Sequence, residues 1–211
     1  ESRGEGSAKA TANITVEVIA RSGAQVKFAA IDRLGENVTA YISRRGKLGN
    51  DASIDWAIGV MNEGNVVADF DSDLIGNGSH ADLKAVALSS GRQVQGIDTR
   101  VTNYGCNSIG NILQHGVILE KATLTFNGIG HIIKGAKGAD AQQESRVLML
   151  SDQARSDANP ILLIDENDVT AGHAASIGQV DPEDMYYLMS RGLDKATAER
   201  LVVRGFLGSV I

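Results

Sequence analysis

The chain has 211 residues with 43% hydrophobic and 22% charged residues, a net charge of −6 and one cysteine. This length allows one large domain with a real core. The negative charge argues against nucleic acid or an anionic membrane surface as the main partner. No apolar run approaches the roughly 20 residues of a membrane span. The single Cys106 excludes an internal disulfide and suits a reducing cytoplasm, where we expect the protein to work.

The first ten residues, ESRGEGSAKA, have neither the apolar core of a signal peptide nor an initiator methionine. We therefore expect that an upstream segment of the protein is missing. Short strands are then predicted from about residue 14 to 165. In ITVEVIA, Ile14, Val16 and Val18 alternate with polar residues. Similar runs follow, separated by Gly, Asn, Asp or Ser: AQVKFAAI, VTAYISR, SIDWAIGVM, NVVADFDSDL, ADLKAVALS, RQVQGIDTRV, GVILEKATLTFNGIGHII and ESRVLMLS.

No helix-length amphipathic segment interrupts these runs, which excludes the α/β classes built from βαβ units. Two all-β architectures remain open, a sandwich or Greek-key barrel and a β-helix. The rows Leu83, Ala85, Ala87 and Val38, Ala40, Ile42 carry small or medium aliphatic residues that suit stacked rungs. Asn-Gly dipeptides, the signal for tight hairpins, occur only at Asn77 and Asn127. The pattern alone does not decide between the two architectures.

A helical hairpin is predicted over residues 182–207. Asp181 is a good N-cap and Pro182 fits the first helical position. Met185, Leu188 and Met189 form an apolar stripe at helical spacing, and a second helix begins at Asp194.

Several sequence motifs of known sites are incomplete in this chain. Asp69, Asp71 and Asp73 alternate, but the positions of the glycine and glutamate of an EF-hand hold Leu74 and His80. The segment GHIIKGAKG lacks the Gly-Lys-Ser/Thr of a phosphate loop and the context of a dinucleotide fingerprint. The histidines lie in no metal or hydrolase motif: His80, His115, His131 and His173. From the residues alone, a packed structural histidine is the default reading of His173.

One long segment, residues 138–193, resembles the SufB/SufD family of iron–sulfur cluster assembly proteins, and its SufD branch most closely. The pieces QQESRVLMLS, ANPILLIDENDVTAGHAASIG and YYLMSRGL occur in that family in this order and spacing. The upstream segment GVILEKATLTFNGIG also fits.

The resemblance implies a right-handed parallel β-helix core, residues 1–170, followed by a C-terminal helical segment, residues 171–211. It implies a non-catalytic scaffold subunit that pairs with a SufB-like subunit and docks a SufC-like ATPase, without nucleic acid or membrane partners. When isolated, the chain is expected to form a homodimer. The helical hairpin corresponds to the ATPase-docking element, with these contact residues: Met185, Tyr186, Leu188, Met189, Arg191 and Leu201.

The resemblance also implies that His173 lies near iron or a cluster at the interface with SufB. Neutral imidazole is a good iron ligand, and Gly172 and Ala174 leave room for a close approach. SufB-type chains carry a cysteine where this chain has Ser145. We therefore expect no stably bound cofactor in this chain alone, but a transient iron or iron–sulfur cluster at the interface. Asn103 replaces a histidine of many relatives, and Cys106 is given no role.

Two alternatives from other classes stay open. One is a β-helix enzyme acting on carbohydrate, which would need paired carboxylates at an aromatic groove, although Trp56 is the only tryptophan. The other is a homodimeric iron-delivery protein that pairs through the same edge.

Overall fold

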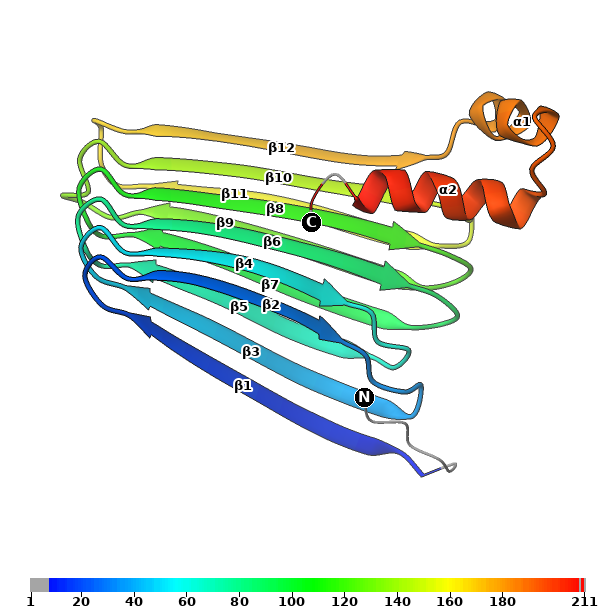
Figure 1. Cartoon of the computed structure of the whole chain (residues 1–211), viewed down its shortest axis with the longest axis horizontal. Coiled ribbons are helices and arrows are strands. Elements are labelled where there is room, and N and C mark those ends of the chain that lie inside the picture. Colours follow the sequence, from blue (N-terminus) through cyan, green and yellow to red (C-terminus); the bar gives the residue numbers. More distant parts are fainter. Residues whose placement is uncertain (1–7, 209, 211) are drawn as a thin grey trace.

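The structure is a computed structural model, which describes residues 8–208 and 210. In this part of the chain, twelve β-strands are followed by two α-helices (Figure 1). The strands are β1 (Ala10–Ala20), β2 (Gln25–Asp32), β3 (Val38–Leu48), β4 (Ser53–Val60), β5 (Val66–Leu74), β6 (His80–Ser89), β7 (Val94–Asn103), β8 (Ile109–Ile118), β9 (Thr123–Ile132), β10 (Asp140–Met149), β11 (Arg155–Ile164) and β12 (Thr170–Gln179). The helices are α1 (Pro182–Ser190) and α2 (Lys195–Leu207).

The strands form two six-stranded parallel sheets, one from the odd-numbered and one from the even-numbered strands. Each strand pairs with the strand two places along the chain, and every pair is parallel. The chain therefore winds as a parallel β-solenoid of about six turns, with β1 and β12 at opposite ends (Figure 1). The predicted β-helix is confirmed, and an antiparallel sandwich or barrel is excluded.

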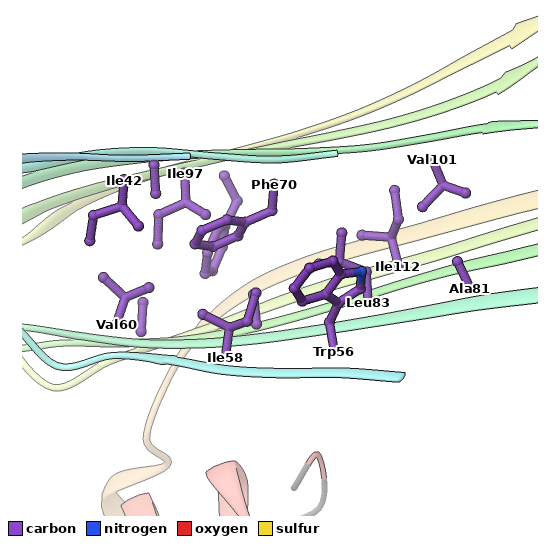
Figure 2. Close-up of a cluster of buried hydrophobic side chains, with 14 of the residues drawn as sticks. Ile42, Trp56, Ile58, Val60, Phe70, Ala81, Leu83, Ile97, Val101 and Ile112 are labelled. Carbon is purple, nitrogen blue, oxygen red and sulfur yellow. The ribbon is translucent and has the colours of Figure 1, made fainter. Parts of the chain in front are cut away.

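The core lies between the two sheets. Figure 2 shows Ile42 and Phe70 of the odd sheet pointing toward Trp56 and Leu83 of the even sheet. All of these side chains are buried, and the Trp56 indole N–H donates to Ser72 Oγ at 3.0 Å. The two inward rows that the sequence predicts are buried throughout: Val38, Ala40, Ile42, Leu83, Ala85 and Ala87. Burial of this apolar surface, at about 25 cal/mol per Å², is what holds the rungs together.

The turns that lead from odd to even strands stack on one another along one edge of the solenoid. The first five have a residue with positive φ two places before the even-numbered strand begins: Gly23, Asp51, Gly78, Asn107 and Gly138. Side chains connect successive turns, since Asn50 Oδ1 accepts the Asn77 N–H and Asn77 Oδ1 accepts the Cys106 N–H. The dipeptide at Asn77 therefore lies in the turn that connects β5 of one sheet with β6 of the other, and the one at Asn127 lies inside β9. Neither forms a hairpin.

Two features differ from the sequence pattern. The long run that starts at residue 116 is divided between β8 and β9 by a turn in which Glu120 has a φ of 55°. The β region also extends past residue 165, because residues 170–179 form a complete strand. Strand gives way to helix between Gln179 and Pro182, and the proposed division into two domains stays a prediction.

The predicted helix starts are confirmed. Asp181 accepts the Glu183 N–H at 2.8 Å, and Asp194 accepts the Thr197 N–H at 2.7 Å. This bond from Thr197 lowers the pKa of Asp194. Neither α1 nor α2 combines the length and the apolar character that crossing a membrane would require.

Candidate functional site

The last turn of the solenoid leaves both sheets with a free edge. Within residues 8–208 and 210, strand β11 pairs only with β9, and β12 only with β10. In β12 the Thr170 N–H donates to Ala139 O, so even-numbered residues bond to β10. Successive residues of a strand direct their backbone N–H and C=O groups to opposite sides, so these groups of the odd-numbered residues of β12 point to the free edge. His173 is one of these residues.

The free edge of β11 is interrupted. The Arg155 N–H donates to Ala122 O, directly before β9, and the Asp165 N–H donates to Ile132 O, at the end of β9. The even-numbered residues of β11 therefore face outward, and Pro160 is among them. Proline has no N–H, so this edge lacks one donor in its middle. The edge of β12 has no such gap.

The His173 side chain lies on the inner face of β12, in register with Gln143 of β10. It is exposed because no further rung of the described chain lies above it. Ala171 and Ala175 flank it on the same face, and the imidazole has no hydrogen-bond or ion-pair partner in the described part of the chain. The small neighbours leave space above the ring for an incoming group.

Buried polar groups form the floor of this open end. The Ser145 hydroxyl, fully buried, donates to Gln114 Oε1 at 2.7 Å. The Gln114 amide N–H groups in turn face Thr99 Oγ1 at 3.1 Å and Asn127 O at 3.3 Å. Ser145, which the resemblance aligns with the SufB cysteine, therefore points into the solenoid one rung below His173.

The remaining polar residues that the sequence singled out lie elsewhere. Asn103 is buried in β7, where its amide donates to Ser108 Oγ at 2.9 Å. Cys106 lies in the turn after β7, and its S–H faces Gly135 O at 3.4 Å. Neither side chain is hydrogen-bonded to His173. In residues 8–208 and 210, no three His, Cys, Asp or Glu side chains gather closely enough to hold a metal ion.

The docking residues lie on different faces of the helical hairpin. Tyr186 is 76% exposed, and Met189 and Leu201 are about half exposed. Met185 and Leu188 are partly buried. The Arg191 guanidinium lies 5.0 Å from the centre of the Tyr187 ring.

Two hollows adjoin the hairpin. Met185 and Met189 share the first, about 260 Å³, with Met149 at the end of β10. Leu201 faces the second, a groove of about 890 Å³. This groove lies between α2 and a row of leucines at the ends of three successive even-numbered strands, β6, β8 and β10. That row consists of Leu88, Leu119 and Leu150.

Sequence reasoning missed Gln143 and Gln114, the two buried amides of the floor. The alternation in QQESRVL contains the signal, because Gln143, Ser145 and Val147 lie on one face and Val147 is a core residue. A polar residue in such a row is normally assigned to the solvent side, and only the register shows otherwise.

The chain matches the family model described as SUF system FeS cluster assembly, SufBD core domain, over residues 1–206. The parallel β-solenoid and the two helices that follow it therefore lie within a SufBD core domain of the iron–sulfur cluster assembly system. The chain belongs to the SufBD family.

Among curated relatives, the iron–sulfur cluster assembly protein SufD of Bacillus subtilis is 52% identical over 200 residues, covering 94% of this chain and 46% of that protein. A SufBD family protein of Mycobacterium leprae is 30% identical over 194 residues, covering 91% of this chain and 22% of its own length. A Staphylococcus epidermidis member is 25% identical, covering 91% and 41%. The chain spans less than half of the length of these relatives.

Proposed function

We propose that this chain is the SufD-type half of a scaffold for iron–sulfur cluster assembly in the cytoplasm, and that it works without catalysing a reaction itself. The observation that carries the proposal is the open end of the solenoid, where two free strand edges surround an unpartnered histidine. A second chain of the same family, SufB-like, would cover this end by adding its strands to β11 and β12. Its arrival would bury the half-exposed inner side chains of the last turn.

In this proposal His173 faces iron or a nascent cluster, which is cargo rather than a resident cofactor. Neutral imidazole binds iron, and the His173 ring has no hydrogen-bond or ion-pair partner within the part of the chain that the structure describes. Ser145 cannot supply a thiolate, so the soft ligand would have to come from the partner. One ligand from each chain suits a product that must be released.

The helical hairpin would dock a SufC-like ATPase. Support comes from the exposure of Tyr186 and Leu201 and from the leucine-lined groove beside α2. An apolar groove next to an exposed helix offers the kind of surface into which a partner's helix packs. All six residues predicted from the resemblance are retained as candidates for this contact.

The carbohydrate-enzyme alternative gains no support from the aromatic residues. Trp56 is buried in the core and bonded to Ser72, so it lines no sugar groove. The homodimeric iron-delivery alternative uses the same free edges and is separated by experiment.

The test is co-purification of this chain with SufB-like and SufC-like partners, comparing wild type, His173→Ala and the control Ser176→Ala. Ser176 lies on the same strand but on its outer face. We expect all three complexes to form equally, and anaerobic cluster reconstitution to collapse only in His173→Ala. Failure of the wild-type complex, with a homodimer persisting in the presence of SufB, would overturn the scaffold proposal in favour of the homodimer. Equal cluster yield in all three variants would remove His173 from the site.

A further inference from the structure

One inward row of side chains changes from apolar to polar along the axis of the solenoid. One row of the even sheet runs in register through all six of its strands. Four apolar residues come first, followed by an amide and an imidazole at the open end. The row is Phe28, Trp56, Leu83, Ile112, Gln143 and His173.

Gln143 is held in a defined orientation. Its side chain is buried, with 5% of the residue exposed, and its Nε2 donates to Ile161 O at 2.9 Å. A carbonyl oxygen only accepts hydrogen bonds, so this contact determines which end of the amide carries the nitrogen. Oε1 consequently points elsewhere, and it has no hydrogen-bond partner among the described residues.

Two glycines of β9 make room for this amide to cross between the sheets. A Cβ at Gly130 would lie 2.5 Å from Gln143 Nε2, and one at Gly128 would lie 3.3 Å from Oε1. The polar groups beneath cannot satisfy Oε1. The Ser145 hydroxyl is used by Gln114, and the Gln114 amide faces Thr99 and Asn127.

His173 carries a donor of the kind that Gln143 Oε1 lacks. The two residues are direct neighbours in register on the same inner face, and the imidazole is also without a partner. A buried acceptor left unpaired costs about 1–3 kcal/mol, and covering the open end would bury the imidazole as well. Histidines that bind metal usually donate their second ring N–H to a carbonyl or carboxylate oxygen.

We infer that Gln143 is a positioning residue for His173. Its Oε1 accepts the imidazole N–H once a partner covers the open end, which fixes one tautomer and presents the other ring nitrogen to iron. This inference rests on the proposed function, because it requires the covered state. It concerns the orientation of the ligand and assigns no chemistry to Gln143 itself.

The experiment measures the tautomer of His173 by long-range ¹H–¹⁵N correlation in ¹⁵N-histidine-labelled chain, free and in complex with an unlabelled SufB-like partner. His173→Ala assigns the signal among the four histidines. The variants are Gln143→Met, which keeps the size and removes the amide, and the control Gln142→Met. Gln142 lies on the outer face of the same strand, in register with Gly172.

In the complex we expect a roughly two- to tenfold excess of one His173 tautomer in wild type and Gln142→Met, as one hydrogen bond provides. Gln143→Met should lose this excess. If Gln143→Met does not fold, Gly130→Ala, whose Cβ would lie 2.5 Å from Gln143 Nε2, displaces the amide without removing it and should have the same effect. Equal tautomer ratios in a complex that forms normally would overturn the inference alone. A wild-type complex that does not form would overturn the proposed function, and the inference with it.

Discussion

His115 of β8 stacks on Phe206 of α2, with ring centroids 4.8 Å apart and planes inclined by 26°. The imidazole is 3% exposed, with Nδ1 at 3.2 Å from Phe206 O and Nε2 at 3.4 Å from Glu144 Oε1. Glu144 lies between Gln143 and Ser145 on β10. The contact therefore joins the helix proposed to dock the ATPase to the strand beneath His173.

Replacing His115 by alanine should loosen α2 without unfolding the solenoid. The stack and the two polar contacts together account for about 1–2 kcal/mol of local stability. Amide hydrogen exchange in α2 should accelerate by roughly tenfold, while the core strands β3–β6 keep their protection. His131→Ala is the control. His131 lies in β9 of the other sheet, is more exposed than His115 and pairs with Asp165. Equal exchange of α2 in both variants would contradict the prediction.

Ser145→Ala should destabilise the chain even though a hydroxyl is all that is lost. Gln114 Oε1 would remain buried without its donor, at a cost of about 1–3 kcal/mol. Urea unfolding measures the change as a lower midpoint with an unchanged slope. Ser176→Ala, on the exposed face of β12, should leave the midpoint within about 0.5 kcal/mol of wild type. A stable Ser145→Ala protein would mean that water replaces the hydroxyl.

Strand alternation in the sequence predicted short strands and two of their inward rows, but it left the β-helix and the sandwich or barrel open, and the family resemblance was needed to choose between them. The inward rows through Leu83 and Ile42 follow directly from period-two alternation, and the scarcity of Asn-Gly hairpin signals correctly indicated parallel neighbours. Strand β12 was not predicted, because Ala171, Gly172 and Ala174 have low β propensity. Its pairing with β10, rather than its composition, makes this segment a strand.

The candidate site could be located only in part. A resemblance was needed to select His173 and Ser145, since nothing in their spacing indicates metal chemistry. The sequence could not show that Gln143 lies under His173, because that contact depends on the register between β10 and β12. Nor could it show that Cys106 lies in a turn away from the open end.

The buried ion pair between Arg44 and Asp32 should tolerate replacement of both residues by apolar ones but not the removal of one residue alone. The guanidinium makes two bonds of 2.7 and 2.6 Å to the carboxylate and lies 5.4 Å from the Phe70 ring centre. Asp32→Ala would leave a buried charge unpaired, which costs about 3–5 kcal/mol, whereas Asp32→Leu with Arg44→Met should be nearly neutral. Thermal unfolding of the two variants tests this difference.

Arg45→Met provides the matched control for that experiment. Arg45 follows Arg44 in β3 but lies on the outer face, half exposed and 3.7 Å from Asp69. An exposed pair of this kind contributes about 0–1 kcal/mol. If Arg45→Met were as destabilising as Asp32→Ala, the distinction between the buried and the surface pair would be wrong.

Asp71 should make the protein less stable as the pH rises through the acidic range. Burial, followed by the charge of Asp69, raises the pKa of Asp71 from 3.8 to about 6. Between these values the folded chain keeps a proton that the unfolded chain has released, so stability falls as pH rises and the deficit stays constant above about pH 6. The shift corresponds to at most about 3 kcal/mol, and to about 1–2 kcal/mol after solvent screening.

Asp71→Asn should therefore exceed wild type in stability by about 1–2 kcal/mol at pH 7.5 and match it below about pH 4. Urea midpoints measured across this range test the sign. Asp157→Asn, an exposed carboxylate of β11, should show no comparable gain at pH 7.5. A gain for Asp71→Asn that is independent of pH would point to packing rather than to the proton.

Pro160 should limit self-association through the free edge of β11. Its missing N–H falls among the groups that face outward, so a second strand added there cannot form an uninterrupted ladder. Pro160→Ala restores the donor, and we expect it to strengthen homodimerisation of the isolated chain by roughly two- to tenfold, as one added hydrogen bond would. Sedimentation velocity over a concentration series measures the dissociation constant. Pro182→Ala, the only other proline change the sequence offers, alters α1 and should leave that constant unchanged. Equal dissociation constants for Pro160→Ala and wild type would show that β12 alone carries the edge contact.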